Sequence, residues 1–384
     1  MRETIFKYID THQEEMLSFW KTIVGHESGS FDKEDLDKLR DFLVATFTDM
    51  GGTVRTCAYH PAGDLIVADF NSHIDTAPII FSGHYDTVFK HGTLAERPFT
   101  IKEDGRAYGP GAYDMKAGVT MATFITKALL EAGYDKHPIR IVLAGDEEVG
   151  HTFSNGSEDF ANAVKGAVAA FNFESGYVDN GFVTGRKGGG RATFTIKGIG
   201  AHAGNEPEKG RSAILEMAHK TIAIQECTNF EEGITYNVGI AKGGTVAISV
   251  PEEATMVVDI RMKMLAQLEQ VEKDLNKVLN TTYVDGTTTT MTYALTMPPM
   301  ETTEGVKEMF RLLEESAKEL NFGDIFMKYV GGGADSAIEV QQGVPTICAV
   351  GIAGGKNHTV DEFAVVETMF TRAKLVANTV LKLA

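Results

Sequence analysis

The sequence predicts an α/β protein in which a mostly parallel, helix-covered sheet is interrupted by a small inserted α+β domain. Short apolar runs alternate with helical patterns through the first half, as in a sheet whose parallel strands are joined by crossover helices. After Gly185 polar and apolar residues alternate, and beyond Pro298 the first pattern returns. We therefore expect a discontinuous first domain at residues 1–186 and 296–384, with an inserted domain at 187–295.

Three apolar runs in the first half are predicted to be buried strands, at 77–82, 139–144 and 167–173. A helix is expected over 115–131, with Gly133 just past its end, where a left-handed residue often terminates a helix. A helix over 306–320 and a strand over 344–351 complete this domain.

The inserted domain is predicted to contain about four strands and two helices. Alternating segments at 191–198, 238–251 and 254–263 are typical of half-exposed strands. The apolar stripe expected on the first helix consists of Ile214, Met217, Ala218, Thr221 and Ile222. The stripe expected on the second helix consists of Leu268, Val271, Leu275, Val278 and Leu279.

Composition excludes several classes of partner. The formal charge of -17 opposes binding to a phosphate backbone, so nucleic acid is not expected. No run reaches the roughly 18 apolar residues of a membrane span, and acidic residues interrupt the first segment, so neither a membrane nor an export signal is expected. Three widely spaced cysteines without a CxxC motif indicate reduced thiols and a cytoplasmic location.

Acidic and histidine residues follow the predicted strands of the first domain. They are His84 with Asp86, Asp114, Glu147 with Glu148, Glu174 and, far downstream, His358. The carboxyl ends of strands in open α/β sheets form the ligand crevice, so we expect these residues to converge on one site. Histidine nitrogens and carboxylate oxygens in that number indicate a metal site.

Each motif also has a plainer interpretation. His84 and Asp86 fit a surface turn, and Asp114 fits a helix N-cap. The acidic run at 146–148 fits a solvated turn, although adjacent carboxylates without cations are unfavourable. His358 fits an ordinary loop residue. Two divalent cations balanced by Asp114, Glu148, Glu174 and one hydroxide would give a neutral cluster, which favours the joint interpretation.

This ordered set of motifs resembles the co-catalytic dinuclear zinc hydrolases, which include bacterial glutamate carboxypeptidase, aminoacylase, succinyl-diaminopimelate desuccinylase and tripeptidase T. The resemblance extends from about residue 60 to the C-terminus. It includes GRKG at 185–188 and KGIGAHAGNEPEKGRSA at 197–213 within the insertion.

The resemblance implies two Zn²⁺ per subunit, with Co²⁺ or Mn²⁺ as substitutes, since N and O ligands accept all three. Asp114 would bridge both ions. The remaining ligands would be His84 and Glu174 for one ion, and Glu148 and His358 for the other. A cis peptide bond is expected after Asp114.

The resemblance also implies catalytic roles. Glu147 would take a proton from the metal-bridging water. Asp86 would orient the metal ligands without binding metal itself. His202 would reach the partner subunit's active site and stabilise the oxyanion, while Arg261 would hold a substrate carboxylate. A homodimer through the inserted domain follows from these roles. By themselves, His202 also fits a surface loop residue and Arg261 an ion pair that stabilises the fold.

The implied activity is hydrolysis of a peptide or N-acyl amide bond in small peptides or N-acyl amino acids. Glu174 favours the glutamate carboxypeptidase branch, because tripeptidase-like members use Asp. An aminoacylase-like deacylase, an aminotripeptidase and a catalytically silent binding scaffold are the alternatives. Two departures bear on substrate choice: Ile248 replaces a frequent Asn, and Ala334 replaces Thr in a late turn.

Overall fold

The computed structural model describes residues 1–383, which form two compact units. The first unit comprises Met1–Gly185, Thr302–Tyr329 and the chain from Ala334 onward. The second comprises Arg186–Glu301 and Val330–Gly333. Within residues 1–383, no helix combines the length and the apolar character that a membrane crossing requires.

The first unit is built on an eight-stranded sheet in the order β1-β2-β6-β3-β7-β17-β9-β16. The strands are β1 (Thr53–Cys57), β2 (Leu65–Phe70), β3 (Ile79–His84), β6 (Ile139–Ala144), β7 (Ala169–Asn172), β9 (Gly181–Arg186), β16 (Phe326–Val330) and β17 (Thr346–Cys348). The four central strands β6, β3, β7 and β17 are parallel. Antiparallel pairs flank them. The predicted α/β class is confirmed.

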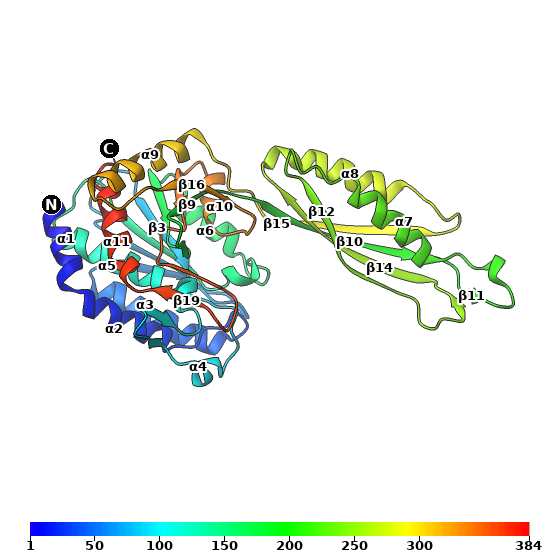
Figure 1. Cartoon of the computed structure of the whole chain (residues 1–384), viewed down its shortest axis with the longest axis horizontal. Helices are drawn as coiled ribbons and strands as arrows, with labels where there is room; N and C mark the ends of the chain where they lie inside the picture. The colour runs from blue at the N-terminus through cyan, green and yellow to red at the C-terminus, as the bar shows by residue number, and fades with distance from the viewer. Residues whose placement is uncertain (384) are drawn as a thin grey trace. The chain divides into compact units, whose positions relative to one another are not determined.

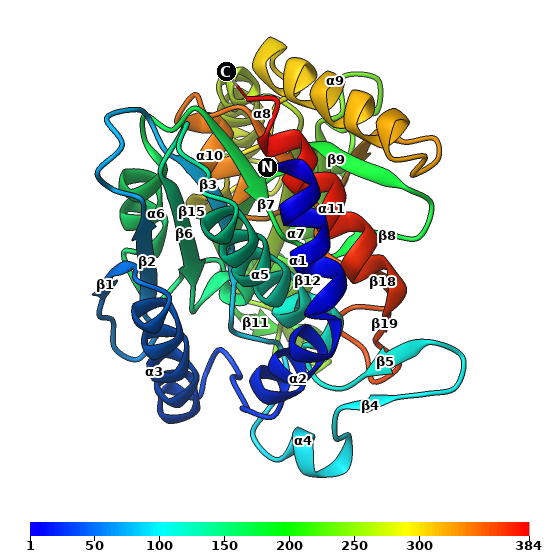
Figure 2. The ribbon, with the colours of Figure 1, turned by 90° about the vertical axis from the view of Figure 1, so that its left-hand side faces the viewer.

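Helices cover both faces of this sheet. One face carries α1 (Arg2–Thr11), α2 (Gln13–Val24), α3 (Lys33–Asp49), α5 (Ala117–Glu131), α9 (Glu304–Glu319) and α11 (Glu367–Val380). Figure 2 shows α1, α5 and α11 in front of the strands. The other face carries α6 (Gly156–Val164) and α10 (Ser336–Gln341). Along β3, Phe81 packs in the core on the face that carries α5, and Ile80 packs in the core on the face that carries α6. Successive side chains of a strand point to opposite faces of its sheet.

Two boundaries beside candidate site residues differ from the sequence prediction, and the strand predicted at 344–351 is limited to β17. Strand β3 runs through His84, because Ser82, Gly83 and His84 continue the ladder with β6. The apolar run ends earlier, but backbone pairing does not need apolar side chains. Helix α5 begins at Ala117, because Asp114 and Met115 have non-helical backbone angles. Gly133 has φ 68°, as expected for a residue that ends a helix.

A smaller sheet in the same unit has the order β4-β5-β19-β18-β8. Its strands are β4 (Thr100–Ile101), β5 (Arg106–Tyr108), β8 (Gly176–Tyr177), β18 (Ala353–Gly355) and β19 (Phe363–Val365). The short helix α4 (Thr93–Glu96) precedes β4.

The second unit is a four-stranded antiparallel sheet in the order β12-β14-β10-β15. Its strands are β10 (Gly188–Lys197), β12 (Thr235–Gly243), β14 (Glu253–Met262) and β15 (Thr288–Met297). Helices α7 (Ala213–Gln225) and α8 (Leu268–Asn280) lie along one face (Figure 1). A further pair, β11 (Ala201–His202) and β13 (Ser249–Val250), is antiparallel.

The apolar stripe predicted for α8 is confirmed, since Val271, Leu275 and Val278 are buried. The stripe predicted for α7 is confirmed only in part, since Met217 is buried in the core of this unit and Thr221 is half-buried. Ile214 and Ile222 are 38% and 58% exposed, and Ala218 is exposed as well.

The buried face of α7 contains a Lys–Glu pair beside the apolar residues Ala213, Met217 and Ile224. Lys220 Nζ donates to the carbonyl oxygens of Val278 and Thr281, at 2.6 Å each, and lies 3.2 Å from Glu216 Oε1. Buried charges are tolerated when they are paired and hydrogen-bonded. The carbonyl groups at the end of α8 therefore allow the polar side of α7 to face the core.

Candidate metal centre

The candidate residues of the first unit converge because of the sheet topology. Strand β3 ends at His84, and β7 ends two residues before Glu174. Strand β6 is followed directly by the turn that contains Glu147 and Glu148. These strands are neighbours and parallel, so their carboxyl ends lie at one edge of the sheet.

His84 belongs to the first group of ligand atoms. Its Nε2 lies 3.5 Å from Asp114 Oδ1 and 3.4 Å from Glu174 Oε1. Its Nδ1 faces two oxygens of Asp86, the backbone carbonyl at 3.1 Å and Oδ1 at 3.3 Å. Both of these oxygens are acceptors, so Nδ1 carries the ring proton and Nε2 is left with a lone pair directed at the two carboxylates.

His358 belongs to the second group. Its Nε2 lies 3.2 Å from Asp114 Oδ2 and 3.0 Å from Glu148 Oε2. Asn357 also donates to Asp114 Oδ2, at 3.1 Å. The two oxygens of Asp114 therefore face two different sets of ligand atoms.

Both groups fit a divalent metal ion. Each offers one histidine nitrogen and two carboxylate oxygens that lie within 4.8 Å of one another. Asp114 Oδ1 is buried and has no hydrogen-bond partner among residues 1–383. A buried anionic oxygen without a donor is costly, and a cation at this point removes that cost.

Asp86 organises the surrounding turn. Its carboxylate accepts the Ser30 hydroxyl at 2.7 Å and the backbone N–H groups of Glu147 and Glu148 at 3.2 Å each. Asp86 is fully buried. It therefore fixes the acidic turn against the end of β3 as well as the ring of His84.

Burial raises the pKa of Glu147 well above its ordinary value. The carboxylates of Glu174 and Asp335 add to this effect. Such surroundings favour a carboxyl group that accepts and holds a proton.

The turn that presents Asp114 is held by Glu362, which is fully buried. One carboxylate oxygen of Glu362 accepts the backbone N–H groups of Tyr113 at 2.7 Å and Asp114 at 3.0 Å. The peptide bond between Asp114 and Met115 is cis, as the sequence analysis expected. Helix capping does not explain Asp114, because α5 begins after Lys116 and has no side-chain cap.

Replacing Glu362 with alanine is expected to lower the free energy of unfolding by about 2 to 3 kcal/mol, because two buried N–H groups lose their acceptor. Urea denaturation of chelator-treated protein measures this loss apart from any metal. Glu362→Gln, which keeps one acceptor oxygen, is the matched control and should lose less. Unchanged stability of the alanine variant would show that Glu362 does not hold the turn.

The model of peptidase family M20/M25/M40 matches residues 80–382, which is most of the chain. The chain belongs to this family. It is therefore a hydrolase and a metallopeptidase. The two groups of candidate ligands in the first unit are what a metallopeptidase requires.

Relatives in the family have several named activities. Carboxypeptidase G2 of Pseudomonas sp. (strain RS-16) is 27% identical over 384 residues, covering 97% of this chain and 91% of the relative. A succinyl-diaminopimelate desuccinylase of Nitrosospira multiformis is 29% identical over 230 residues, covering 53% of this chain and 58% of the relative.

Solved structures show the same fold. Aminopeptidase PepT from Bacillus cereus matches with a TM-score of 0.82 at 21% identity, covering 97% of this chain and 98% of that one. A dinuclear metal-binding peptidase of the M20 family from Bacillus subtilis matches with a TM-score of 0.72 at 16% identity, covering 97% and 99% of the two chains.

Two candidate residues of this M20 chain, His202 and Arg261, belong to the second unit. His202 is exposed on β11, and its Nδ1 accepts the N–H groups of Gly204 and Asn205 at 3.1 Å each. Arg261, on β14, makes a two-point ion pair with Asp259, at 2.9 and 3.0 Å. Ile248, which replaces a frequent Asn, also lies in this unit and is 67% exposed.

Sequence reasoning missed a buried histidine next to the acidic turn. His151 lies between Asp146 at 2.7 Å and Asp335 at 2.8 Å. Burial lowers the pKa of His151, but the two carboxylates outweigh it and raise the pKa to about 11. Asp146 is thus neutralised by His151, so only Glu147 and Glu148 of the acidic run remain for a metal centre.

Glu362, Asn357 and Ser30 were also missed. Asn357 and Glu362 flank His358 closely in sequence, which is a signal that could have directed attention to them. Ser30 had no such signal, because it lies 56 positions from Asp86.

Proposed function

We propose that this chain hydrolyses the amide bond next to a free carboxylate in small peptides or N-acyl amino acids, using two zinc ions held by the two groups of ligands. The observation that supports this proposal most is the shared carboxylate of Asp114, whose two oxygens face separate His–carboxylate sets. Glu147, adjacent in the chain to the proposed ligand Glu148, is the proposed general base.

Two bound divalent ions supply a Lewis acid for the substrate carbonyl and lower the pKa of a water molecule at the site. Glu147 takes the proton from the attacking water and later delivers it to the leaving nitrogen as the C–N bond breaks. The place of Glu147 next to the proposed ligand Glu148 in the acidic turn supports this role. Asp86 holds His84 and the backbone of Glu147 in place meanwhile.

His202 is proposed to donate a hydrogen bond to the developing oxyanion in the partner subunit. Its Nδ1 is occupied as an acceptor of two backbone N–H groups, so its Nε2 carries the proton and is free to donate.

Arg261 is proposed to bind the substrate carboxylate. Asp259 occupies its Nε and Nη2, which leaves the Nη1 donors for a ligand. Ile248 and Ala334 differ from the residues that the family often has at these positions. We propose that these two differences contribute to the substrate preference of this chain.

A cytoplasmic homodimer is part of the proposal. None of the three cysteines forms a disulfide bond, in keeping with a reducing compartment. The exposed side of α7 carries Ile214, Leu215 and Ile222, at 38%, 51% and 58% exposure, which suits an interface between copies of the insertion.

Replacing Ile222 with glutamate is expected to shift the protein from dimer to monomer, because a charge would be buried in an apolar interface. Size-exclusion chromatography with light scattering measures the mass. Val178→Glu, at a position 63% exposed in the first unit, is the matched control and should remain dimeric. An Ile222→Glu variant with unchanged mass would contradict a dimer through α7.

The test of the activity is a substrate panel hydrolysed by zinc-loaded protein, with Glu147→Ala as the blank. The panel contains peptides and N-acyl compounds that end in Glu or Asp, simple N-acetyl amino acids, and unblocked tripeptides. Preference for a C-terminal acidic residue supports the proposal. Preference for N-acetyl amino acids or tripeptides would assign the chain to the deacylases or aminotripeptidases, and no hydrolysis at all would favour a binding scaffold.

A further inference from the structure

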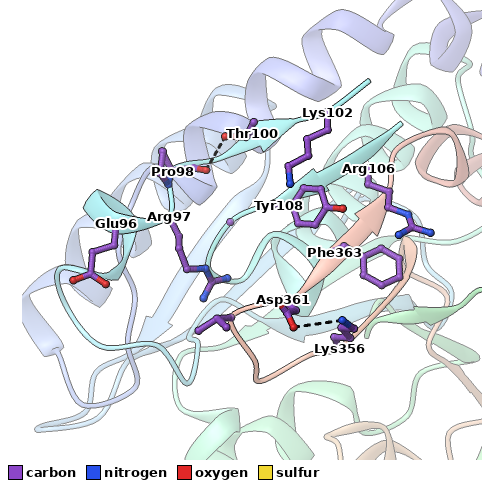
Figure 3. Close-up of a pocket in the computed structure, with 12 residues that line it drawn as sticks. Glu96, Arg97, Pro98, Thr100, Lys102, Arg106, Tyr108, Lys356, Asp361 and Phe363 are labelled. Carbon is purple, nitrogen blue, oxygen red and sulfur yellow. Dashed lines mark hydrogen bonds and ion pairs between the residues drawn. The ribbon is translucent and has the colours of Figure 1, made fainter. Parts of the chain in front are cut away.

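The first unit contains a hollow of about 580 Å³ that none of the proposed catalytic residues lines. It lies among the segment after α4, the β4–β5 hairpin, β19 and the loop that contains His358 (Figure 3). Four cations line it, against two carboxylates, Glu96 and Asp361. The cations are Arg97, Lys102, Arg106 and Lys356. We call this feature the basic hollow.

Three of these cations rest on aromatic rings. Lys102 Nζ lies 4.2 Å from the centre of the Tyr108 ring, and the Arg106 guanidinium lies 4.4 Å from that of Phe363. The Arg97 guanidinium lies 4.9 Å from the centre of the Phe89 ring. Ring contacts hold a cation in place without cancelling its charge.

Carboxylates do not neutralise these three cations. Among residues 1–383, no carboxylate forms an ion pair with Arg97, Lys102 or Arg106, whereas Lys356 lies 3.4 Å from Asp361 in an exposed pair. The chain as a whole has 53 acidic and 36 basic residues, so an uncompensated basic group is unusual on it. The basic hollow therefore attracts anions locally.

Arg97 has unused hydrogen-bond donors. Its Nη1 and Nη2 are buried, and neither has an acceptor within residues 1–383. Figure 3 shows its side chain directed from the segment after α4 toward the space beside Asp361 and Lys356. A rotation of the guanidinium would bring these donors to a bound anion, which pairs well with a planar fork of N–H groups.

The basic hollow shares a loop with the candidate metal centre. Lys356 and Asp361 line it, and His358 lies between them in the chain. The hollow is also lined by Gly109, which precedes the turn that presents Asp114. A ligand in the hollow therefore contacts the segment that carries His358.

We propose that the basic hollow is a binding site for a small organic anion that carries carboxylate or phosphate groups. Lys102, Arg106 and Arg97 bind the anionic groups, and the rings of Tyr108 and Phe363 contact the apolar part of the ligand. The volume lies within the range of about 300 to 1,000 Å³ that is typical of small-molecule sites. The site does not depend on which amide bond the enzyme hydrolyses.

The first test titrates inorganic phosphate into the metal-loaded protein by calorimetry. The double variant Lys102→Glu/Arg106→Glu should bind phosphate at least 10-fold more weakly than the wild type. Lys21→Glu/Lys7→Glu, at exposed positions of α2 and α1, makes the same charge change elsewhere and should bind like the wild type. The residues of the candidate metal centre are the same in all three proteins, so phosphate bound there should contribute equally to each titration.

Equal phosphate affinity in the double variant and the control would overturn the proposal, as would the absence of binding by the wild type. If the charge-reversed protein does not fold, as judged by circular dichroism, Lys102→Gln/Arg106→Gln replaces it with the same expected loss.

A second measurement distinguishes two sources of the anion and rests on the proposed function. If the anion is part of the substrate, the double variant raises KM for an acyl dipeptide with an additional carboxylate but not for its carboxamide analogue. If the anion is a separate small molecule, both KM values stay unchanged while phosphate binding is lost. Because the calorimetry needs no turnover, failure of the anion site and failure of the proposed hydrolysis remain distinguishable.

Discussion

Replacing Glu147 with alanine is expected to lower kcat by about 10³-fold while both metal ions remain bound. General acid–base groups contribute roughly 10² to 10⁴-fold to rates. In the proposed assignment Glu147 is not a ligand, since the two candidate groups consist of His84, Asp114, Glu174, Glu148 and His358. Steady-state kinetics gives the rate, and mass spectrometry of the metals in the same samples gives the metal content.

Glu158→Ala is the matched control for Glu147→Ala, because it removes an exposed carboxylate from α6. The control should keep full activity. Loss of metal from Glu147→Ala would mean that Glu147 binds metal and is not the base, and near-normal turnover with both metals present would assign the proton transfer to another group.

Replacing Asp114 with alanine is expected to remove both metal ions and abolish activity, because its two oxygens serve both groups of ligands. Glu174→Ala and Glu148→Ala should each weaken only one site, since each carboxylate belongs to one group. Metal content after dialysis should therefore fall from two ions per chain to about none in the first variant and to about one in the others.

Circular dichroism is the control for folding in this series, because Asp114 is 5% exposed and belongs to a tightly bonded turn. If Asp114→Ala is folded and still binds two ions, the shared-ligand assignment is wrong. If Glu174→Ala and Glu148→Ala each lose both ions, the two sites are not separable in the way the geometry indicates.

The convergence of the candidate ligands could be predicted from the sequence, because ligand sites in open α/β sheets form at the carboxyl ends of the strands. His84, Glu148 and Glu174 each follow an apolar run, and parallel strands bring their carboxyl ends together. Family resemblance then supplied the division into two groups. The structure places the same side chains in those two groups, although Glu174 and His358 are 184 residues apart in the chain.

The supporting residues could not be predicted in this way. Glu362 holds the backbone of Tyr113 from 249 positions away, and His151 pairs with Asp335 from 184 positions away. Neither contact follows a periodic pattern, so only the three-dimensional arrangement reveals it.

The error on α7 has a different cause. An apolar stripe usually marks the buried face of a helix. The rule fails when polar side chains on another face find buried hydrogen-bond partners. Here Lys220 and Glu216 have such partners at the end of α8 and in the segment after it. The apolar residues Ile214 and Ile222 are left on the outside, where a second copy of the chain is proposed to cover them.

A zinc titration of chelator-stripped protein, with amide hydrolysis and bound metal followed in the same samples, tests the dinuclear assignment. Hydrolysis should be absent from stripped protein and reach its maximum at two bound zinc ions per chain. Full activity in stripped protein, or a maximum at a single bound ion, would contradict a dinuclear centre built on Asp114.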